Sequence, residues 1–191
     1  MAVVLAAPAL ASEMPEGFVY LRDVDPTIQQ DIRYAGSNNF TARPVPGYDA
    51  AECVLVRQAA EALRTVQAEL KNKGFSLKVY DCYRPARAVA AFVDWAKLPD
   101  DPGAKETYYP NLAKGDLFPG YIATRSGHSR GATLDLTLVA IGESGEALHA
   151  ASGMDGDSCT AMKTGAAADG SLAMGTNFDC FDVKANTTPA A

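Results

Sequence analysis

The sequence of 191 residues has no excess of basic residues and no long apolar run. Its 17 Lys and Arg are outnumbered by 23 Asp and Glu, so the formal net charge is −6. This balance argues against a nucleic-acid partner, because such surfaces need clustered positive charge. The most apolar run is too short to cross a bilayer, so we expect no stable membrane insertion. The absence of any C-x-x-C pair argues against a structural zinc cluster.

That apolar run lies at the N-terminus and reads MAVVLAAPALA. It has the apolar core and the A-x-A cleavage pattern of a secretory signal, but no Lys or Arg precedes it. We interpret residues 1–11 as a signal peptide that is incomplete at its N-terminus; the alternative is that the run is not a signal. The expected location is the periplasm or the cell exterior.

Four cysteines allow three disulfide pairings, and disulfides are typical of exported proteins. Cys53 opens a helical pattern and Cys82 ends a strand pattern, so the two could meet where a helix packs on a sheet. Cys159 and Cys180 both lie in the Gly-rich later part of the chain. We therefore expect the pairs Cys53–Cys82 and Cys159–Cys180. The alternative is that some of the four are buried free thiols.

Hydrophobic periodicity predicts two helices, at 50–73 and 86–95, and alternation predicts two main strands, at 75–80 and 134–141. Short strands are expected at 18–21, 27–34 and 121–124. Residues 98–120 are expected to be mostly loop, and loops of this length are often functional. No repeat or linker divides the chain, so residues 12–191 are interpreted as one domain. Helices with separated strands favour an α+β fold over a βαβ series.

The run SGHSRGATLDLT, at 126–137, carries the most chemical information. It places His128 and Asp135 seven residues apart, and both side chains are normal zinc ligands. Gly131 between them would allow a tight backbone turn that brings the two side chains together. On chemistry alone, a loop histidine and a solvated aspartate are an equally open interpretation.

This run resembles the zinc motif of the D-Ala-D-Ala dipeptidases of the VanX type. The resemblance extends over residues 20–182 and includes four further blocks in the family's order: DIRYAGSNNFTARPVPGY, YDCYRPARAV, KETYYPN and MGTNFDCFD. It implies a Hedgehog/DD-peptidase-like fold, with a small, mostly antiparallel sheet and helices packed on one side.

The resemblance also implies a catalytic centre with one zinc ion per chain. His128 and Asp135 would be two of its three zinc ligands. Arg84 would stabilise the transition state, since a fixed guanidinium beside the scissile carbonyl can stabilise developing negative charge. An ion pair after a strand is the alternative for Arg84.

The substrate implied is the small dipeptide D-Ala-D-Ala, in a pocket closed by residues 98–120. Tyr34, Ser126 and Asp179 resemble pocket positions, and Asp179 would pair with the free ammonium group of the dipeptide. A turn-capping role is the alternative for Asp179. Four aromatic residues are expected in the core rather than in the pocket: Phe92, Trp95, Phe178 and Phe181.

The family's third ligand and its general base come from a Glu-x-x-His near the C-terminus, after the MGTNFDCFD block. Here the only such spacing is EALH, Glu146 to His149, which lies before that block and is interpreted as an exposed turn. We therefore expect the domain to be truncated at its C-terminus. Losing a general base typically costs about 10²–10⁴ in rate, so low activity is expected.

The function predicted is zinc-dependent hydrolysis of D-Ala-D-Ala in cell-wall peptidoglycan metabolism. One alternative is a D,D- or L,D-carboxypeptidase of the same fold, for which Asp179 should not matter because its substrates lack a free amine at that place. The other is a non-catalytic remnant that at most binds cell-wall peptide. The sequence predicts no oligomeric state.

Overall fold

The computed structural model describes most of the chain, and the ranges described are 14–148, 158–161, 167 and 169–187. The expected signal peptide and His149 lie outside these residues. None of the helices within the described ranges combines the length and apolarity needed to cross a membrane.

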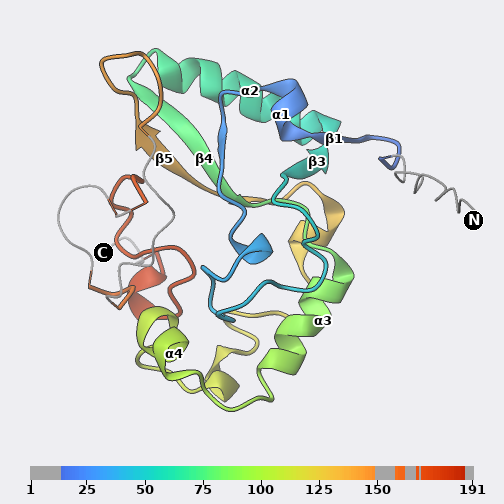
Figure 1. The fold of residues 1–191 in the computed structure, drawn as a ribbon, viewed down its shortest axis with the longest axis vertical. Coiled ribbons are helices and arrows are strands. Elements are labelled where there is room, and N and C mark those ends of the chain that lie inside the picture. Colours follow the sequence, from blue (N-terminus) through green and yellow to red (C-terminus); the bar gives the residue numbers. More distant parts are fainter. Residues whose placement is uncertain (1–13, 149–157, 162–166, 168, 188–191) are drawn as a thin grey trace, which may run out of the picture.

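Two small sheets form the centre of the fold (Figure 1). The larger has the strand order β2-β4-β5, with β2 at Gln29–Gln30, β4 at Phe75–Asp81 and β5 at Asp135–Ala140. Strand β4 pairs antiparallel with β5 and parallel with β2. The smaller sheet pairs β1, Phe18–Tyr20, antiparallel with β3, Val54–Val56. Two of the three pairings are antiparallel, which agrees with the α+β class expected from the sequence.

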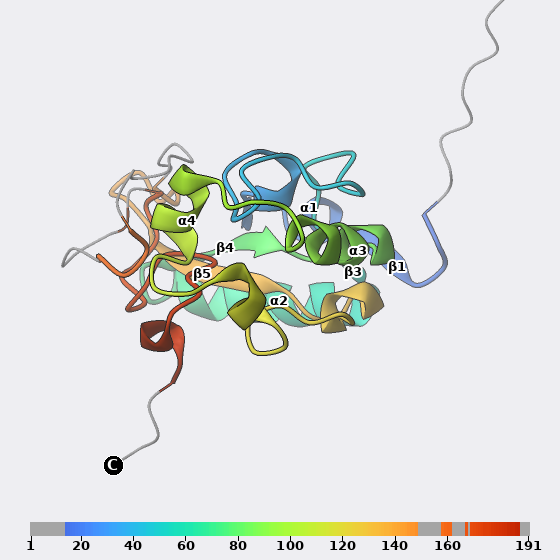
Figure 2. The same cartoon turned by 90° about the horizontal axis from the view of Figure 1, so that it is seen from below.

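In the described part of the chain four α-helices flank the sheets: α1 at Leu21–Val24, α2 at Arg57–Lys71, α3 at Ala86–Trp95 and α4 at Pro102–Tyr108. Helix α2 lies along one face of β4 (Figures 1 and 2). Its inner face closes an aliphatic core with β3 and β4, made of residues that include Leu55, Leu63, Leu77 and Val79.

Helices α3 and α4 belong to a second, largely aromatic core rather than to the α2 side of the sheet. Its largest buried members are Tyr34, Phe40, Phe92, Trp95, Tyr109 and Phe181. Phe40 contacts the rings of Phe92, Trp95 and Phe181, with centroids 4.8–5.1 Å apart. The site described below lies where this aromatic core meets the end of β4.

Three expectations from the sequence are wrong in extent or type. The strand predicted at 27–34 is reduced to Gln29–Gln30, and Arg33–Ala35 forms a 3₁₀ turn. The helix predicted at 50–73 begins only at Arg57, because Val54–Val56 pairs with β1 as a strand. The two valines are β-branched and suit a strand, and pairing with a distant segment cannot be seen in local periodicity. Residues 121–124 form no strand; the amides of Tyr121 and Ile122 both donate to the carbonyl of Leu117 in a turn.

The segment 98–120, expected to be mostly loop, contains helix α4 and a 3₁₀ turn at Lys114–Leu117. The carboxylate of Asp101 caps α4 by accepting a hydrogen bond from the amide of Ala104 at 2.9 Å, and Pro102 is its first residue. This is the usual N-terminal signal of a helix.

Both disulfides expected from the sequence are present. Cys53–Cys82 joins the start of β3 to the end of β4, and Cys159–Cys180 joins two segments of the C-terminal part. The second pair lies against α4, since the amide of Cys159 donates to the carbonyl of Thr107 at 2.8 Å.

Candidate metal site and adjoining cavity

His128 is positioned by a short 3₁₀ turn, Gly127–Arg130. Ser126 caps the turn, with its Oγ accepting from the amide of His128 at 3.2 Å. Gly131 ends the turn with φ +71°, and a Cβ there would lie 2.3 Å from the Phe18 ring. Glycine is therefore required on two counts, backbone conformation and space. The turn it permits directs the chain from His128 back to Asp135 at the start of β5.

The imidazole of His128 and the carboxylate of Asp135 face each other, with Nε2 3.6 Å from Oδ1. His128 Nδ1 lies 3.0 Å from the carbonyl oxygen of Cys82, which can only accept, so Nδ1 carries the proton in the neutral ring. The lone pair of Nε2 is then directed towards Asp135. A tetrahedral zinc with bonds of about 2.0–2.2 Å separates two ligand atoms by about 3.4 Å, so this pair fits such an ion.

The charges at the pair are coupled. Burial alone would lower the pKa of His128, but a hydrogen bond with Asp81 and the charge of Asp135 outweigh burial, and the pKa is raised. Burial raises the pKa of Asp135 above its usual value, although the imidazole opposes this. A divalent cation between the two groups would favour the neutral imidazole and the ionised carboxylate instead.

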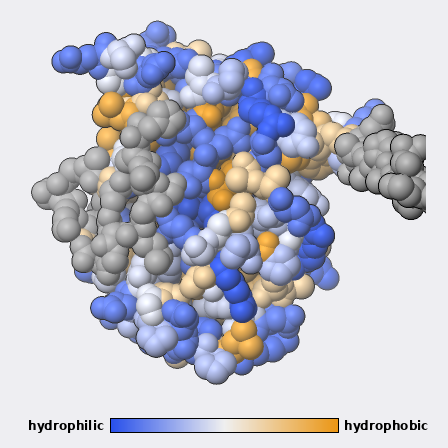
Figure 3. Space-filling model, viewed as in Figure 1, coloured by the Kyte–Doolittle hydropathy of each residue, from blue (hydrophilic) through white to orange (hydrophobic). Residues whose placement is uncertain are grey.

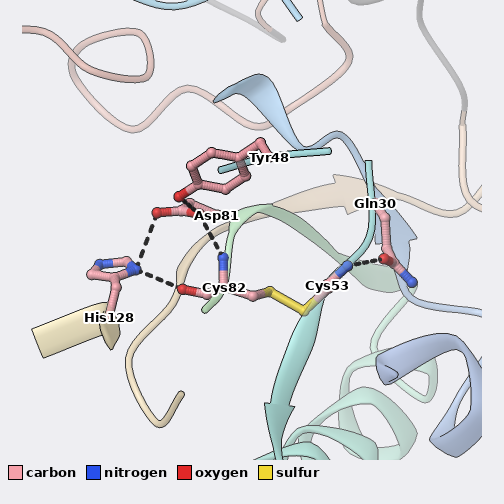
Figure 4. Close-up of a disulfide and its surroundings, with 6 residues drawn as sticks. All are labelled: Gln30, Tyr48, Cys53, Asp81, Cys82 and His128. Atoms are coloured by element: carbon pink, nitrogen blue, oxygen red, sulfur yellow. Dashed lines mark hydrogen bonds and ion pairs between the residues drawn. A yellow bond between two sulfur atoms is a disulfide. The ribbon is translucent and has the colours of Figure 1, made fainter. Parts of the chain in front are cut away.

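Asp81, at the end of β4, is a part of the site that the sequence reasoning missed. Its carboxylate is fully buried, and its Oδ1 accepts from the Tyr48 hydroxyl at 2.6 Å and from the Cys82 amide at 2.9 Å. Its Oδ2 accepts from Nε and Nη2 of Arg84 at 2.9 and 2.7 Å. The same oxygen lies 3.2 Å from His128 Nδ1 (Figure 4).

Asp81, His128 and Asp135 offer ligand atoms that all lie within 4.8 Å of one another. However, both oxygens of Asp81 already accept hydrogen bonds, and it contacts the imidazole nitrogen that faces away from Asp135. These contacts suit Asp81 to orienting the imidazole of His128 and the guanidinium of Arg84 rather than to binding a metal itself. A polar residue ending an apolar strand, three positions before Arg84, was the available signal in the sequence.

Arg84 stands between the two carboxylates. Its Nη2 is 2.7 Å from Asp81 and 3.6 Å from Asp135, and its guanidinium lies over the rings of Tyr34 and Phe92 at 5.1 and 5.3 Å. The ion pair that was the alternative role for Arg84 is thus present, and it fixes the guanidinium beside the imidazole–carboxylate pair. An oxyanion forming there would meet an already oriented positive charge.

Tyr34 connects this centre to Asp179. Its hydroxyl donates to Asp179 Oδ2 at 2.8 Å, while its ring lies under Arg84. Asp179 has φ +58°, a left-handed conformation that is uncommon outside glycine. Burial, and secondly repulsion by Asp135, raise the pKa of Asp179 to about 7. A cationic ligand beside this buried carboxyl group would favour its ionised form.

Asp135 and Asp179 both line a cavity of about 510 Å³. Residues at the centre of this face are mostly hydrophilic, with a few apolar residues beside them (Figure 3). Other lining side chains include Asn38, Tyr80, Tyr108, Thr137 and Phe178. Tyr108 comes from α4, so the segment 98–120 does contribute to the pocket wall.

The four aromatic residues expected in the core all contact it. Phe92, Trp95 and Phe181 are buried there, and Phe178 packs against the core but also lines the cavity, so the expectation that it stays out of the pocket is wrong. Ser126 caps the turn of His128 and is not among the residues that line this cavity. Glu146 is exposed in a turn after Ala140, the last residue of β5. Asp135 is at the opposite end of that strand.

An imidazole and a carboxylate facing each other beside a fixed guanidinium form an arrangement that suits a metal-dependent hydrolase. A profile of the family described as D-ala-D-ala dipeptidase matches residues 14–169. The chain therefore belongs to the D-Ala-D-Ala dipeptidase family, whose members are metallopeptidases.

Curated relatives agree with this membership. The D-alanyl-D-alanine dipeptidase of Enterococcus faecalis is 39% identical over 143 residues, which cover 74% of this chain and 70% of the relative. The enzyme of that name from Streptomyces coelicolor is 42% identical over 126 residues, and that from Enterococcus faecium 39% over 126. In both of these, the match covers 65% of this chain and 62% of the relative.

Proposed function

We propose that this protein hydrolyses D-alanyl-D-alanine with one zinc ion per chain. The observation that carries the proposal is the separation of 3.6 Å between His128 Nε2 and Asp135 Oδ1, beside the guanidinium of Arg84. Membership of the family and the names of three relatives support the substrate.

His128 Nε2 and Asp135 Oδ1 would hold the zinc, because an imidazole and a carboxylate are ligands that suit this ion. When bound, zinc polarises the scissile carbonyl and lowers the pKa of a bound water. The Cys82 carbonyl and Asp81 support this role of His128, because they hold the proton on Nδ1.

Arg84 would stabilise the negative charge that develops on the carbonyl oxygen. Its two hydrogen bonds to Asp81 hold the guanidinium in place before substrate arrives, so little reorganisation is needed. Asp179 would receive the ammonium group of the dipeptide, with Tyr34 fixing its carboxylate. Ser126 supports binding indirectly here, by fixing the turn of His128.

We further propose that the protein acts in the periplasm or outside the cell, in peptidoglycan metabolism. Two disulfides support an oxidising compartment. Cell fractionation of the tagged protein tests this location, and recovery in the cytoplasm with free thiols would contradict it.

The experiment that tests the function compares D-Ala-D-Ala with its N-acetylated form, in the presence of zinc, and measures the D-alanine released. We expect release from the free dipeptide only, and none from either substrate with the variant His128→Ala. Equal release from both substrates would favour the carboxypeptidase alternative, since Asp179 would then not select a free amine. Binding of the dipeptide without release would favour the non-catalytic alternative.

A further inference from the structure

The Cys53–Cys82 disulfide lies directly against the candidate metal site. The carbonyl oxygen of Cys82 is 3.0 Å from His128 Nδ1, and the amide of Cys82 donates to Asp81 Oδ1 at 2.9 Å (Figure 4). One residue of the disulfide therefore contacts both the proposed zinc ligand and the carboxylate that orients it. Two residues further along the chain is Arg84.

Cys82 follows the last residue of β4, where the ladder with β5 is already irregular, with a shift between Val79 and Asp81. Beyond Asp81 no residue pairs with β5, so the sheet does not fix the direction of the Cys82 carbonyl. The amide of Tyr83 donates to the carbonyl of Val54 at 3.0 Å, which is a single bond to the neighbouring strand. The disulfide is a second link, to Cys53, the residue directly before β3.

Cys53, at the other end of the disulfide, is fixed on three sides. Its amide donates to Gln30 Oε1 at 2.8 Å, its carbonyl accepts from the amide of Leu21 at 2.9 Å, and Val54 after it begins β3. Cys53 is completely buried. The disulfide thus links three well-fixed segments to Cys82, whose own amide and carbonyl bond to the site residues Asp81 and His128.

We propose that the Cys53–Cys82 disulfide is a positioning element of the metal site, which holds the Cys82 carbonyl where it sets the proton and the direction of His128. The inference rests on the proposed function, since it takes His128 as the zinc ligand. Groups that contact the second nitrogen of a ligating histidine commonly change metal affinity by about 10–100-fold when they are lost.

The second disulfide supplies a matched control. The sequence separation is 21 residues for Cys159–Cys180 and 29 residues for Cys53–Cys82. The two cross-links therefore restrict the unfolded chain to a similar degree. Among the described residues, neither Cys159 nor Cys180 forms a hydrogen bond with His128 or with the two carboxylates around it.

The test compares the double variants Cys53→Ser/Cys82→Ser and Cys159→Ser/Cys180→Ser. Zinc Kd is measured by competition with a chromophoric chelator, and thermal unfolding is measured on the metal-free proteins. We expect both variants to lose a similar amount of stability, but only the first to bind zinc about 10–100-fold more weakly. The second should keep its zinc Kd within about threefold. Equal weakening in both, or no weakening in the first, would overturn the inference.

Gln30→Ala tests the same inference without removing a disulfide, and so does not depend on the folding of the serine variant. It removes the acceptor for the Cys53 amide. Gln67→Ala is its control, because Gln67 Oε1 accepts from the Leu77 amide at 2.8 Å in the aliphatic core. Only Gln30→Ala should raise the zinc Kd, by several-fold; equal effects of the two would contradict the inference.

The same measurements separate this inference from the proposed function. A wild-type protein that binds no zinc would refute both. A wild-type protein that binds zinc and releases D-alanine, while Cys53→Ser/Cys82→Ser keeps its zinc Kd, would refute the inference alone.

Discussion

Asp179 should destabilise the folded protein at neutral pH, although it is the residue proposed to bind the ammonium group of the substrate. In the folded state its pKa is raised from 3.8 to about 7, by burial and secondly by Asp135. Between these pH values the folded protein binds a proton that the unfolded chain has released, so stability falls as pH rises from about 4 to about 7. We therefore expect Asp179→Asn to stabilise the metal-free protein above pH 7.

The size of this effect follows from the pKa. A rise from 3.8 to about 7 corresponds to about 4 kcal/mol in the free energy of unfolding at pH 8. The side chain is only partly buried by surface area, so screening by water reduces this, and we expect a gain of about 2 kcal/mol. For a chain of this size that is roughly 4–8 °C in Tm. Asparagine accepts the hydrogen bond of Tyr34 and tolerates the left-handed backbone.

The assay is thermal and urea unfolding of both proteins in EDTA at pH 4 and pH 8. Asp182→Asn is the control of opposite sign, because the amide of Asn111 lowers the pKa of Asp182 and its ionised form stabilises the fold. The reasoning is refuted if Asp179→Asn gives no gain at pH 8, or the same gain at pH 4. The variant should also lose affinity for D-Ala-D-Ala, a stability gain at the expense of function.

Three further predictions concern the site. Gly131→Ala should lower the free energy of unfolding by about 2 kcal/mol or more in urea unfolding, because its φ is +71° and its Cβ would clash with Phe18; an unchanged midpoint would contradict this. Arg84→Lys should lower kcat/KM about 100-fold, because lysine cannot make both hydrogen bonds to Asp81; wild-type kinetics would refute it. KM for D-Ala-D-Ala should fall as pH rises through about 7, where Asp179 ionises; a flat profile would exclude that role.

The sequence correctly placed His128 and Asp135 beside each other because the geometry that joins them is local. His128, Gly131 and Asp135 lie within one short turn and the start of a strand, so residue types and a glycine at the turn carry most of the information. The disulfide pairing was also accessible, since Cys53 and Cys82 stood at the edges of recognisable patterns and Cys159 and Cys180 both lay in the Gly-rich later part of the chain.

The role of Asp81 could not be predicted in the same way, because it depends on residues from three separate segments. Tyr48, Cys82, Arg84 and His128 all contact its carboxylate, and only the folded chain brings them together. Strand β3 was missed for a related reason. Its pairing with β1 joins residues far apart in the sequence and overrides the helical periodicity around it.

The location of bound zinc tests the central claim most directly. Crystals of the wild-type protein soaked in zinc and measured at the zinc absorption edge give the position of the ion independently of activity. We predict an anomalous peak within about 2.0–2.2 Å of both His128 Nε2 and Asp135 Oδ1. A peak elsewhere, with no ion between these two atoms at saturating zinc, would contradict the account.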